Sequence, residues 1–350
     1  MVTPIEIAGR KVGPGQPCLI IAEAGVNHNG DVRLAKQLVD AAVAANADAV
    51  KFQTFKAERL VTQQAPKAAY QRRRTGESES QLEMLRRLEL SPRAHEELAE
   101  YCRQQGILFL STPFDEESAA LLANLHVPAF KIGSGELTNL PLLEYVASKN
   151  RPMIVSTGMS TLAEVETAVR AIQRVNNRGL IVLHCVSNYP ADPAEVNLRA
   201  MQTMVRTFNV PVGYSDHTLG IEVALAAVAL GACVIEKHVT LDRTMPGPDQ
   251  RASIEPDELS ALVRGVRMIE VALGDGRKQP TPRETDTAAV ARRSLVAARD
   301  VPAGGRLTQE LIAIKRPGTG LSPALQAQLV GRTAKRSIPA GTLLTWDMVE

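Results

Sequence analysis

The sequence predicts a (β/α)8 barrel, an α/β fold, followed by a small C-terminal domain. First, short apolar runs alternate with longer amphipathic stretches from residue 18 to residue 274. Second, the apolar runs are almost continuous, as expected for parallel strands that are covered on both faces. Third, there are eight such runs in about 250 residues, which is the size of a (β/α)8 barrel. An open doubly wound sheet is the alternative, but no GxGxxG motif follows the first run.

The predicted strands are short and evenly spread along the chain. They lie at 18–25, 48–53, 107–112, 129–134, 152–157, 180–185, 210–215 and 233–238.

The predicted helices carry recognisable start and stop signals. A helix over 32–45 follows Asp31, a good N-cap residue. A helix over 162–173 starts with Thr161 and Glu164, the spacing of a capping box. A helix over 256–273 has Pro256 in its first turn and Gly274 just past its end.

One connection is much longer than the others. More than 20 residues separate the strand at 48–53 from a helix predicted near 80–104. Long loops in compact domains are often functional, and in a barrel this loop would overhang the C-terminal face. We therefore consider residues 54–80, with Tyr70, Arg72, Arg73 and Arg74, as a lid over the substrates. A solvated loop is the alternative.

The last part of the chain differs in pattern from the barrel. Residues 300–312 and 337–349 match at five of 13 positions, and each reads as a short strand, a Pro-Ala-Gly turn and a short helix. The polar, proline-containing segment before them reads as a linker. We predict a barrel at 1–275, a linker at 276–292 and a compact domain at 293–350.

Composition excludes several classes of protein. The net charge of +2 gives no reason to expect a nucleic-acid or membrane partner. No stretch approaches 18 apolar residues, and the N-terminus has no signal-peptide pattern. The four cysteines form no CxxC pair and suggest no disulfide framework. We expect a cytoplasmic protein.

Polar residues close all eight predicted strands. In a (β/α)8 barrel, active-site groups come from the C-terminal ends of the strands. Burying unpaired polar groups there costs several kcal/mol each, so a core built only for stability would avoid them. A single Lys or His at such a position is usually solvated or part of the packing. Polar residues at all eight strand ends indicate a site.

Two subsets of these residues have chemical meaning. His217 and His238 close neighbouring strands and can share one divalent metal ion, with Glu23 as a further ligand or as a base. The other subset offers cations and hydroxyl donors, which suit a phosphate or a carboxylate. Its members are Lys51, Lys131, Thr112, Ser134, Ser156 and Ser215.

The segment 243–250, RTMPGPDQ, follows the last predicted strand. Its two prolines and glycine predict a stiff turn that would hold Asp249 over the barrel mouth. A rigidly held acid there suits the hydroxyl groups of a sugar, although a solvated turn residue is equally compatible with the spacing. Lys237 should point away from His238, because neighbouring strand residues alternate faces.

Nine motifs occur in the order found in the sialic acid synthase family, which this sequence resembles over nearly the whole chain. They are AEAGVNHNG, KFQ, STPFD, KIGSGE, STGM, LHCVSNYP, GYSDHT, EKH and PGPD. The C-terminal segment, with KRPGTG and the paired PAG turns, resembles the family's antifreeze-like domain, a β-clip-like fold also called SAF.

The resemblance implies an enzyme, a transferase, that condenses phosphoenolpyruvate with an N-acyl hexosamine and releases phosphate. It implies a divalent cofactor held by His217 and His238, with Mn²⁺ first and Mg²⁺ or Co²⁺ as alternatives, and Glu23 beside it. The phosphoenolpyruvate pocket would comprise Lys51, Thr112, Lys131, Ser134, Ser156, Ser215 and either Ser187 or Asn188. Gln53, Tyr189 and Asp249 would contact the amino sugar.

The family also implies a homodimer with swapped C-terminal domains, in which Arg316 reaches the partner's active site. Arg292 and Arg293 stand where some members have an aromatic residue near the acyl group, so the acyl preference is open.

The residues leave several functions open. N-acetylmannosamine, giving N-acetylneuraminate, is the first expected substrate, and 2,4-diacetamido-2,4,6-trideoxy-mannose, giving legionaminic acid, is the alternative. From another class, a Schiff-base aldolase would use Lys51, Lys131 or Lys237. A binding module on an inert barrel is a further alternative, but eight polar strand ends argue against it.

Overall fold

The computed structural model describes residues 2–68, 71–72, 79–175 and 178–350. The chain forms two compact units, residues 1–274 and 275–350, and each is described by itself. Tyr70, Arg73 and Arg74 of the predicted lid lie outside the described residues.

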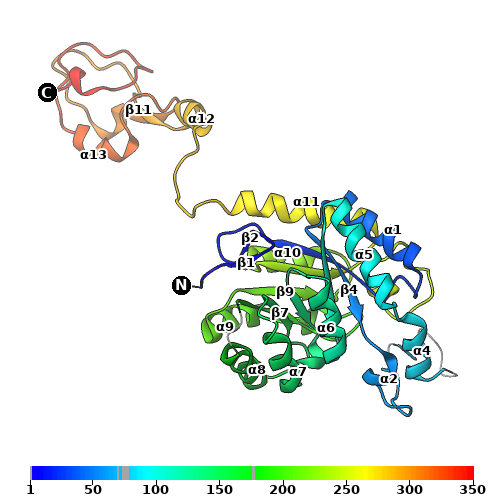
Figure 1. Ribbon diagram of the computed structural model, residues 1–350. Coiled ribbons are helices and arrows are strands. Elements are labelled where there is room, and N and C mark those ends of the chain that lie inside the picture. The colour runs from blue at the N-terminus through cyan, green and yellow to red at the C-terminus, as the bar shows by residue number, and fades with distance from the viewer. Residues whose placement is uncertain (1, 69–70, 73–78, 176–177) are drawn as a thin grey trace. The chain divides into compact units, whose positions relative to one another are not determined.

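The first unit is an eight-stranded parallel sheet that nearly closes into a barrel, which confirms the predicted fold class (Figure 1). The hydrogen-bonded order is β5-β4-β3-β10-β9-β8-β7-β6, and β5 also lies beside β6. The strands are β3 (Leu19–Gly25), β4 (Ala49–Thr54), β5 (Leu108–Pro113), β6 (Phe130–Ile132), β7 (Met153–Ser156), β8 (Leu180–Cys185), β9 (Val212–Asp216) and β10 (Val234–His238).

Helices surround the strands (Figure 1). They are α1 (Val32–Ala44), α2 (Ala57–Leu60), α4 (Gln81–Leu88), α5 (Pro92–Gln105), α6 (Glu116–Asn124), α7 (Leu140–Ala147), α8 (Leu162–Arg174), α9 (Arg199–Phe208), α10 (Glu222–Ala229) and α11 (Pro256–Leu273). None of the helices in the described part of the chain has both the length and the apolar content that crossing a membrane requires.

The predicted start signals are confirmed. The Asp31 side chain accepts a hydrogen bond from Arg33 N, and Thr161 and Glu164 form a reciprocal capping box. Pro256 occupies the first turn of α11, and Gly274 follows its last residue. The single helix predicted near 80–104 is wrong, because Ser91 caps a new helix, α5, after α4 has ended.

A hairpin that the sequence did not suggest closes the N-terminal end of the barrel. It consists of β1 (Ile5–Ile7) and β2 (Arg10–Val12), which pair antiparallel. Ile7 and Val12 pack on the first inward residues of the strands, including Leu19, Ile21 and Leu110. These strands are three residues long, too short to give a readable period of two.

The second unit begins with a short helix and is otherwise built from short strands and turns. The helix α12 (Glu284–Ala291) falls within the segment predicted as a linker, and β11 (Ser294–Ala297) pairs with β12 (Ile312–Lys315). The two similar segments end in matching 3-10 helices, Gln309–Leu311 and Trp346–Met348, and Val301 pairs with Ile338 between them. The short helix α13 (Gln326–Leu329) lies between these segments.

Candidate functional site

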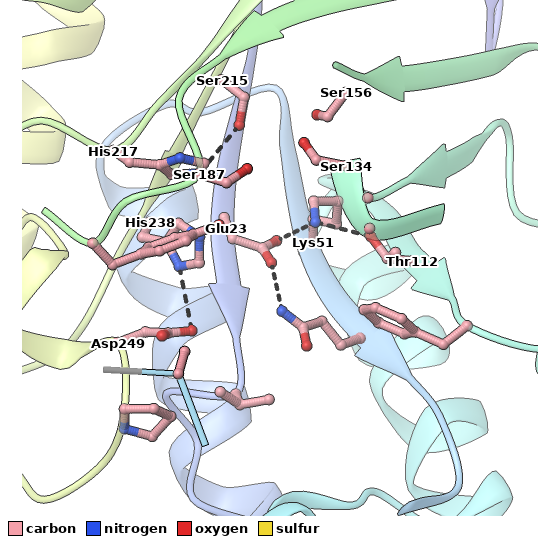
Figure 2. A pocket seen from close by; sticks show the side chains of 18 of the residues that line it. Glu23, Lys51, Thr112, Ser134, Ser156, Ser187, Ser215, His217, His238 and Asp249 are labelled. Carbon is pink, nitrogen blue, oxygen red and sulfur yellow. Dashed lines mark hydrogen bonds and ion pairs between the residues drawn. The ribbon is translucent and has the colours of Figure 1, made fainter. Parts of the chain in front are cut away.

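A cavity of about 370 Å³ lies at the C-terminal ends of the barrel strands (Figure 2). It brings together every site residue that the sequence predicted in the barrel. These are Glu23, Lys51, Gln53, Thr112, Lys131, Ser134, Ser156, Ser187, Tyr189, Ser215, His217, His238 and Asp249. Arg316 belongs to the second unit, where it is exposed.

The strand period explains why these side chains meet. Successive residues of a strand point to opposite faces, so alternate residues enter the barrel. On β10, Glu236 and His238 line the cavity, whereas Lys237 between them donates to Asp216 on the other face of the sheet. The predicted orientation of Lys237 is therefore confirmed.

Two buried lysines and two buried carboxylates form the floor of the cavity. Lys51 Nζ lies 2.7 Å from Glu23 Oε2, 3.0 Å from Thr112 Oγ1 and 3.7 Å from Glu236 Oε1. Lys131 Nζ lies 3.2 Å from the same Glu236 oxygen. All four charged groups are at most 3% exposed, so their charges interact with little screening by water.

Burial and the neighbouring charges shift the pKa values of these groups in different directions. Burial raises the pKa of Glu23 to about 7, against the opposing effect of Lys51. Burial also favours a raised pKa at Glu236, but the charges of Lys131 and Lys51 outweigh it and lower that pKa. Burial lowers the pKa of Lys131. Near neutral pH, Glu236 is therefore charged, and Glu23 is able to accept or release a proton.

Hydroxyl groups line the wall beside Lys131. Ser134 Oγ accepts a hydrogen bond of 2.9 Å from Gly158 N, and a Cβ atom at Gly158 would lie 2.1 Å from Ser187 Oγ. A glycine at 158 therefore allows Ser134 and Ser187 to approach the same backbone. The Ser156 hydroxyl is buried and has no hydrogen-bond partner among the described residues. It is free to donate to a ligand.

The structure also separates the two candidates at 187 and 188. Ser187 lines the cavity, whereas Asn188 Nδ2 lies 3.5 Å from Glu195 Oε2. Between the two, Ser187 is the residue placed to contact a bound molecule.

His217 and His238 lie next to each other on one side of the cavity (Figure 2). Their ring centroids are 5.5 Å apart, and the ring of Tyr189 lies 4.2 Å from that of His217. Burial lowers the pKa of His217 to about 4 and also lowers the pKa of His238. Both imidazoles are therefore neutral at pH 7, the form that binds metals.

The environment of these imidazoles fits a divalent ion. His217 Nδ1 lies 2.6 Å from the Val186 carbonyl, so it carries the proton and leaves Nε2 as the acceptor, 3.5 Å from Ser215 Oγ. His238 Nδ1 is buried, has no hydrogen-bond partner in the part of the chain that the structure describes, and lies 4.0 Å from Asp249 Oδ2. No group of three or more His, Cys, Asp or Glu side chains that could hold a metal ion occurs among the described residues, and His217 and His238 are the two imidazoles that line the cavity.

The far wall of the cavity is apolar. Val26, Met84, Leu88 and Phe114 line it and belong to one small hydrophobic cluster, which Leu85 joins. Ala68 and Gln71, which belong to the predicted lid segment, also line the cavity. Burial raises the pKa of Asp249, at the edge of the cavity, to about 6.

Sequence reasoning missed Glu236 and the apolar wall as parts of the site. Glu236 stands two residues before His238 on the same strand, so the period of two that places His238 inside the barrel also places Glu236 there. Met84 and Leu88 come from α4, after the long connection, and no local pattern tied that helix to the barrel mouth.

Comparisons with known proteins agree with the geometry. The NeuB family profile matches residues 38–278, and the SAF domain profile matches residues 292–350. The N,N'-diacetyllegionaminic acid synthase of Legionella pneumophila is 48% identical over 97% of this chain and 96% of its own length. The enzyme of the same name from Campylobacter jejuni is 47% identical over 93% and 98%. Human N-acetylneuraminate-9-phosphate synthase is 39% identical over 99% and 98%.

Solved structures give the same result. The sialic acid synthetase of Leptospira borgpetersenii, in complex with citrate, superposes with a TM-score of 0.74 at 37% identity, covering 82% of this chain and 95% of that one. The spore coat polysaccharide biosynthesis protein SpsE of Bacillus subtilis superposes with a TM-score of 0.69 at 36% identity, covering 99% of each chain.

Proposed function

Because this chain belongs to the NeuB family, we propose that it condenses phosphoenolpyruvate with an N-acylated amino sugar to form a nine-carbon sugar acid and phosphate. The observation that carries the proposal is that a pocket of two lysines and several hydroxyls adjoins two neutral imidazoles in one cavity. The cations suit the phosphate and carboxylate of phosphoenolpyruvate, and the imidazoles suit a divalent ion.

Lys51 and Lys131 would bind the anionic ends of phosphoenolpyruvate. Lys51 already pairs with Glu23, and Lys131 pairs with Glu236. Bound phosphoenolpyruvate would replace part of these ion pairs. Thr112, Ser134, Ser156, Ser187 and Ser215 would donate hydrogen bonds to its oxygens. These fixed donors would orient the methylene carbon toward the sugar, and positioning of this kind accounts for much of the rate in such reactions.

The reaction balances with groups that the cavity contains. The methylene carbon of phosphoenolpyruvate forms a bond to the aldehyde carbon of the open-chain sugar, whose oxygen gains a proton. Water adds to the neighbouring carbon and loses one proton, which balances the proton gained by the aldehyde oxygen. The bond from that carbon to the bridging oxygen then breaks, phosphate leaves with this oxygen and the remaining proton of the water, and the carbon becomes a keto group. His217 and His238 would hold a divalent ion, with Mn²⁺ as the first candidate, which would supply Lewis acidity at the aldehyde oxygen. Glu23 has a pKa of about 7, which suits it to take the proton that the water loses.

For the sugar, we propose 2,4-diacetamido-2,4,6-trideoxy-mannose, which gives N,N'-diacetyllegionaminic acid. Two N,N'-diacetyllegionaminic acid synthases are 48% and 47% identical to this chain, against 39% for the human neuraminate-9-phosphate enzyme. The apolar wall of Val26, Met84, Leu88 and Phe114 supports this choice, since a 6-deoxy sugar presents a methyl group and two acetyl groups. Gln53, Tyr189 and Asp249 remain the proposed polar contacts to the sugar.

The direct test is a comparison of substrates with the purified protein, phosphoenolpyruvate and Mn²⁺. The candidates are 2,4-diacetamido-2,4,6-trideoxy-mannose, N-acetylmannosamine and its 6-phosphate, with phosphate release and product mass as the measurements. We expect the diacetamido sugar to have the highest kcat/KM. A preference for N-acetylmannosamine would instead assign N-acetylneuraminate as the product, and no phosphate release with any amino sugar would overturn the proposal as a whole.

A Schiff-base aldolase is not supported by the geometry. Lys237 is held by Asp216 outside the cavity, and Lys51 and Lys131 are paired with carboxylates inside it. Borohydride in the presence of pyruvate should therefore trap no adduct on the protein.

We further propose a homodimer in which Arg316 of one subunit completes the cavity of the other, as the resemblance implies. Mixing provides a test that does not depend on either subunit alone. His217→Ala and Arg316→Ala should each be inactive, and a refolded mixture should recover part of the wild-type activity, because one site per mixed dimer is intact. No recovery from a mixture shown to contain mixed dimers would exclude the swapped arrangement. The cytoplasmic location remains a prediction.

A further inference from the structure

The strands β9 and β10 carry polar groups on both faces, and only one face lines the cavity. Ser215 and His217 at the end of β9, and Glu236 and His238 on β10, line the cavity. Asp216 and Lys237 alternate with them and are also buried, at 1% exposure each. The proposed chemistry makes no use of this second pair.

Asp216 and Lys237 form a dense set of hydrogen bonds behind the imidazoles. They are partners in the strand register, and Lys237 Nζ lies 2.6 Å from Asp216 Oδ2. The same ammonium group donates to the Thr218 carbonyl at 2.6 Å. Asp216 Oδ1 accepts from Thr218 N at 2.9 Å and from the Thr218 hydroxyl at 2.8 Å. The Tyr214 hydroxyl lies 3.2 Å from it.

Stability alone does not explain such a pair. A buried ion pair gains little net free energy, because the desolvation of both charges offsets their attraction, and an apolar pair is often as stable. The pair instead fixes the position of the end of β9 relative to β10.

Both residues of the pair are adjacent in the sequence to an imidazole. His217 lies between Asp216 and Thr218, so the Lys237 ammonium binds the Asp216 carboxylate on one side of it and the Thr218 backbone carbonyl on the other. His238 directly follows Lys237. His217 has a second support, its Nδ1 contact with the Val186 carbonyl, but His238 Nδ1 has no hydrogen-bond partner among the described residues. The placement of His238 therefore depends on its backbone, which is paired with β3 and the Ile254 amide and directly follows Lys237.

We propose that Asp216 and Lys237 are positioning residues that hold the imidazoles of His217 and His238 at the spacing needed to share one divalent cation. The proposal rests on the proposed function, since it takes the two imidazoles as the ligands. It predicts that loss of the pair weakens metal binding, while the phosphoenolpyruvate pocket, most of whose residues lie on other strands, stays intact.

The test uses the full-length double variant Asp216→Asn with Lys237→Met, which removes both charges and keeps an oxygen acceptor for Thr218. Mn²⁺ binding to metal-free protein is measured by calorimetry, and phosphoenolpyruvate binding is measured separately without metal. We expect the Kd for Mn²⁺ to rise about 10- to 100-fold, the usual effect of losing a group that supports a ligand. The Kd for phosphoenolpyruvate should not change.

Thr54→Val is the matched control. Thr54 is a buried polar residue on β4, where its hydroxyl lies 2.7 Å from Ser111 Oγ and 2.9 Å from His95 Nε2, and β4 carries neither imidazole. This variant should lower Tm without changing the Kd for Mn²⁺. If the double variant does not fold, the single variant Asp216→Asn is measured in the same way.

The outcomes distinguish this proposal from the one on which it rests. Wild-type protein that binds no Mn²⁺, or that binds it as well after His217→Ala, would overturn the metal assignment itself. Wild-type protein that binds Mn²⁺ through His217, together with an unchanged Kd in the double variant, would overturn only the positioning role. An equal loss of Mn²⁺ and phosphoenolpyruvate binding would show that the pair merely maintains the fold.

Discussion

The inward residues of the barrel strands change character from one end to the other. Toward the N-terminal end they are apolar and pack under the β1–β2 hairpin; two residues further along the same strands they are polar and line the cavity. On five strands an apolar inward residue is followed two positions later by a polar one that lines the cavity: Ile21 by Glu23, Ala49 by Lys51, Leu110 by Thr112, Ile154 by Ser156, and Val234 by Glu236.

The difference separates stability from chemistry within one core. Apolar side chains at the closed end contribute about 1.5–3 kcal/mol each through burial. Buried charges at the open end cost free energy unless they are paired, and they are paired in a way that substrates can replace. Changes at the two ends should therefore affect different measurements.

The largest effect is expected at the open end, from His217→Ala. Loss of a metal ligand removes several kcal/mol of charge stabilisation, and at about 1.4 kcal/mol per tenfold this corresponds to a fall in kcat of roughly a thousandfold. The measurement is phosphate release at saturating substrates and Mn²⁺, with Tm as the control for folding. Near wild-type activity in buffer treated with a chelator would contradict the assignment of this histidine.

Lys131→Met should have the next largest effect, and on a different parameter. This lysine is proposed to bind an anionic group of phosphoenolpyruvate, and charged hydrogen bonds contribute about 1.5–3 kcal/mol, or roughly 10- to 150-fold. We expect KM for phosphoenolpyruvate to rise by this factor. The KM for the sugar should not change and is the internal control. A rise only in the KM for the sugar would show that Lys131 binds the sugar and not phosphoenolpyruvate.

Ile181→Ala tests the closed end. Ile181 is fully buried among the apolar residues there, and an isoleucine-to-alanine change in a core costs about 2–5 kcal/mol. We expect a lower free energy of unfolding in urea with both KM values unchanged at 25 °C. A specific rise in KM without loss of stability would mean that the two ends are not independent.

The same comparison shows why most of the site could be predicted from sequence. A parallel barrel places all strand C-termini at one end, so residues far apart in the chain, such as Lys51 and His238, were expected to meet. Every predicted barrel residue does line the cavity. Glu236 needed only the same period of two, applied to a residue whose partners, Lys51 and Lys131, come from other strands.

The remaining parts depend on contacts that leave no local signal. Met84 and Leu88 reach the cavity from a helix beyond the longest connection, and the hairpin at 5–12 owes its position to the apolar layer beneath it. Tertiary packing determines both, so periodicity and capping could not reveal them. The turn after β3 is a further example, because no local pattern in the sequence predicts that its histidine is buried.

That histidine, His28, gives the smallest predicted effect and tests the open end outside the cavity. It is 1% exposed, its Nδ1 accepts from Gly30 N at 3.0 Å, and burial lowers its pKa to about 4. The unfolded chain binds a proton here below about pH 6.5, and the folded chain does so only near pH 4. His28 therefore adds stability that is present above pH 6.5 and is lost as the pH falls toward 4.

His28→Asn should remove this contribution, since asparagine can still accept from Gly30 N but does not titrate. The free energy of unfolding of the wild type should fall by about 1 kcal/mol more than that of the variant between pH 6.5 and pH 5.5. Urea unfolding of metal-free protein at both pH values measures the difference. Other buried groups with shifted pKa values, among them His217, His238 and Glu23, titrate in both proteins, so the difference between the two slopes isolates His28. Equal slopes for the two proteins would show that His28 is protonated at the same pH in the folded and unfolded states.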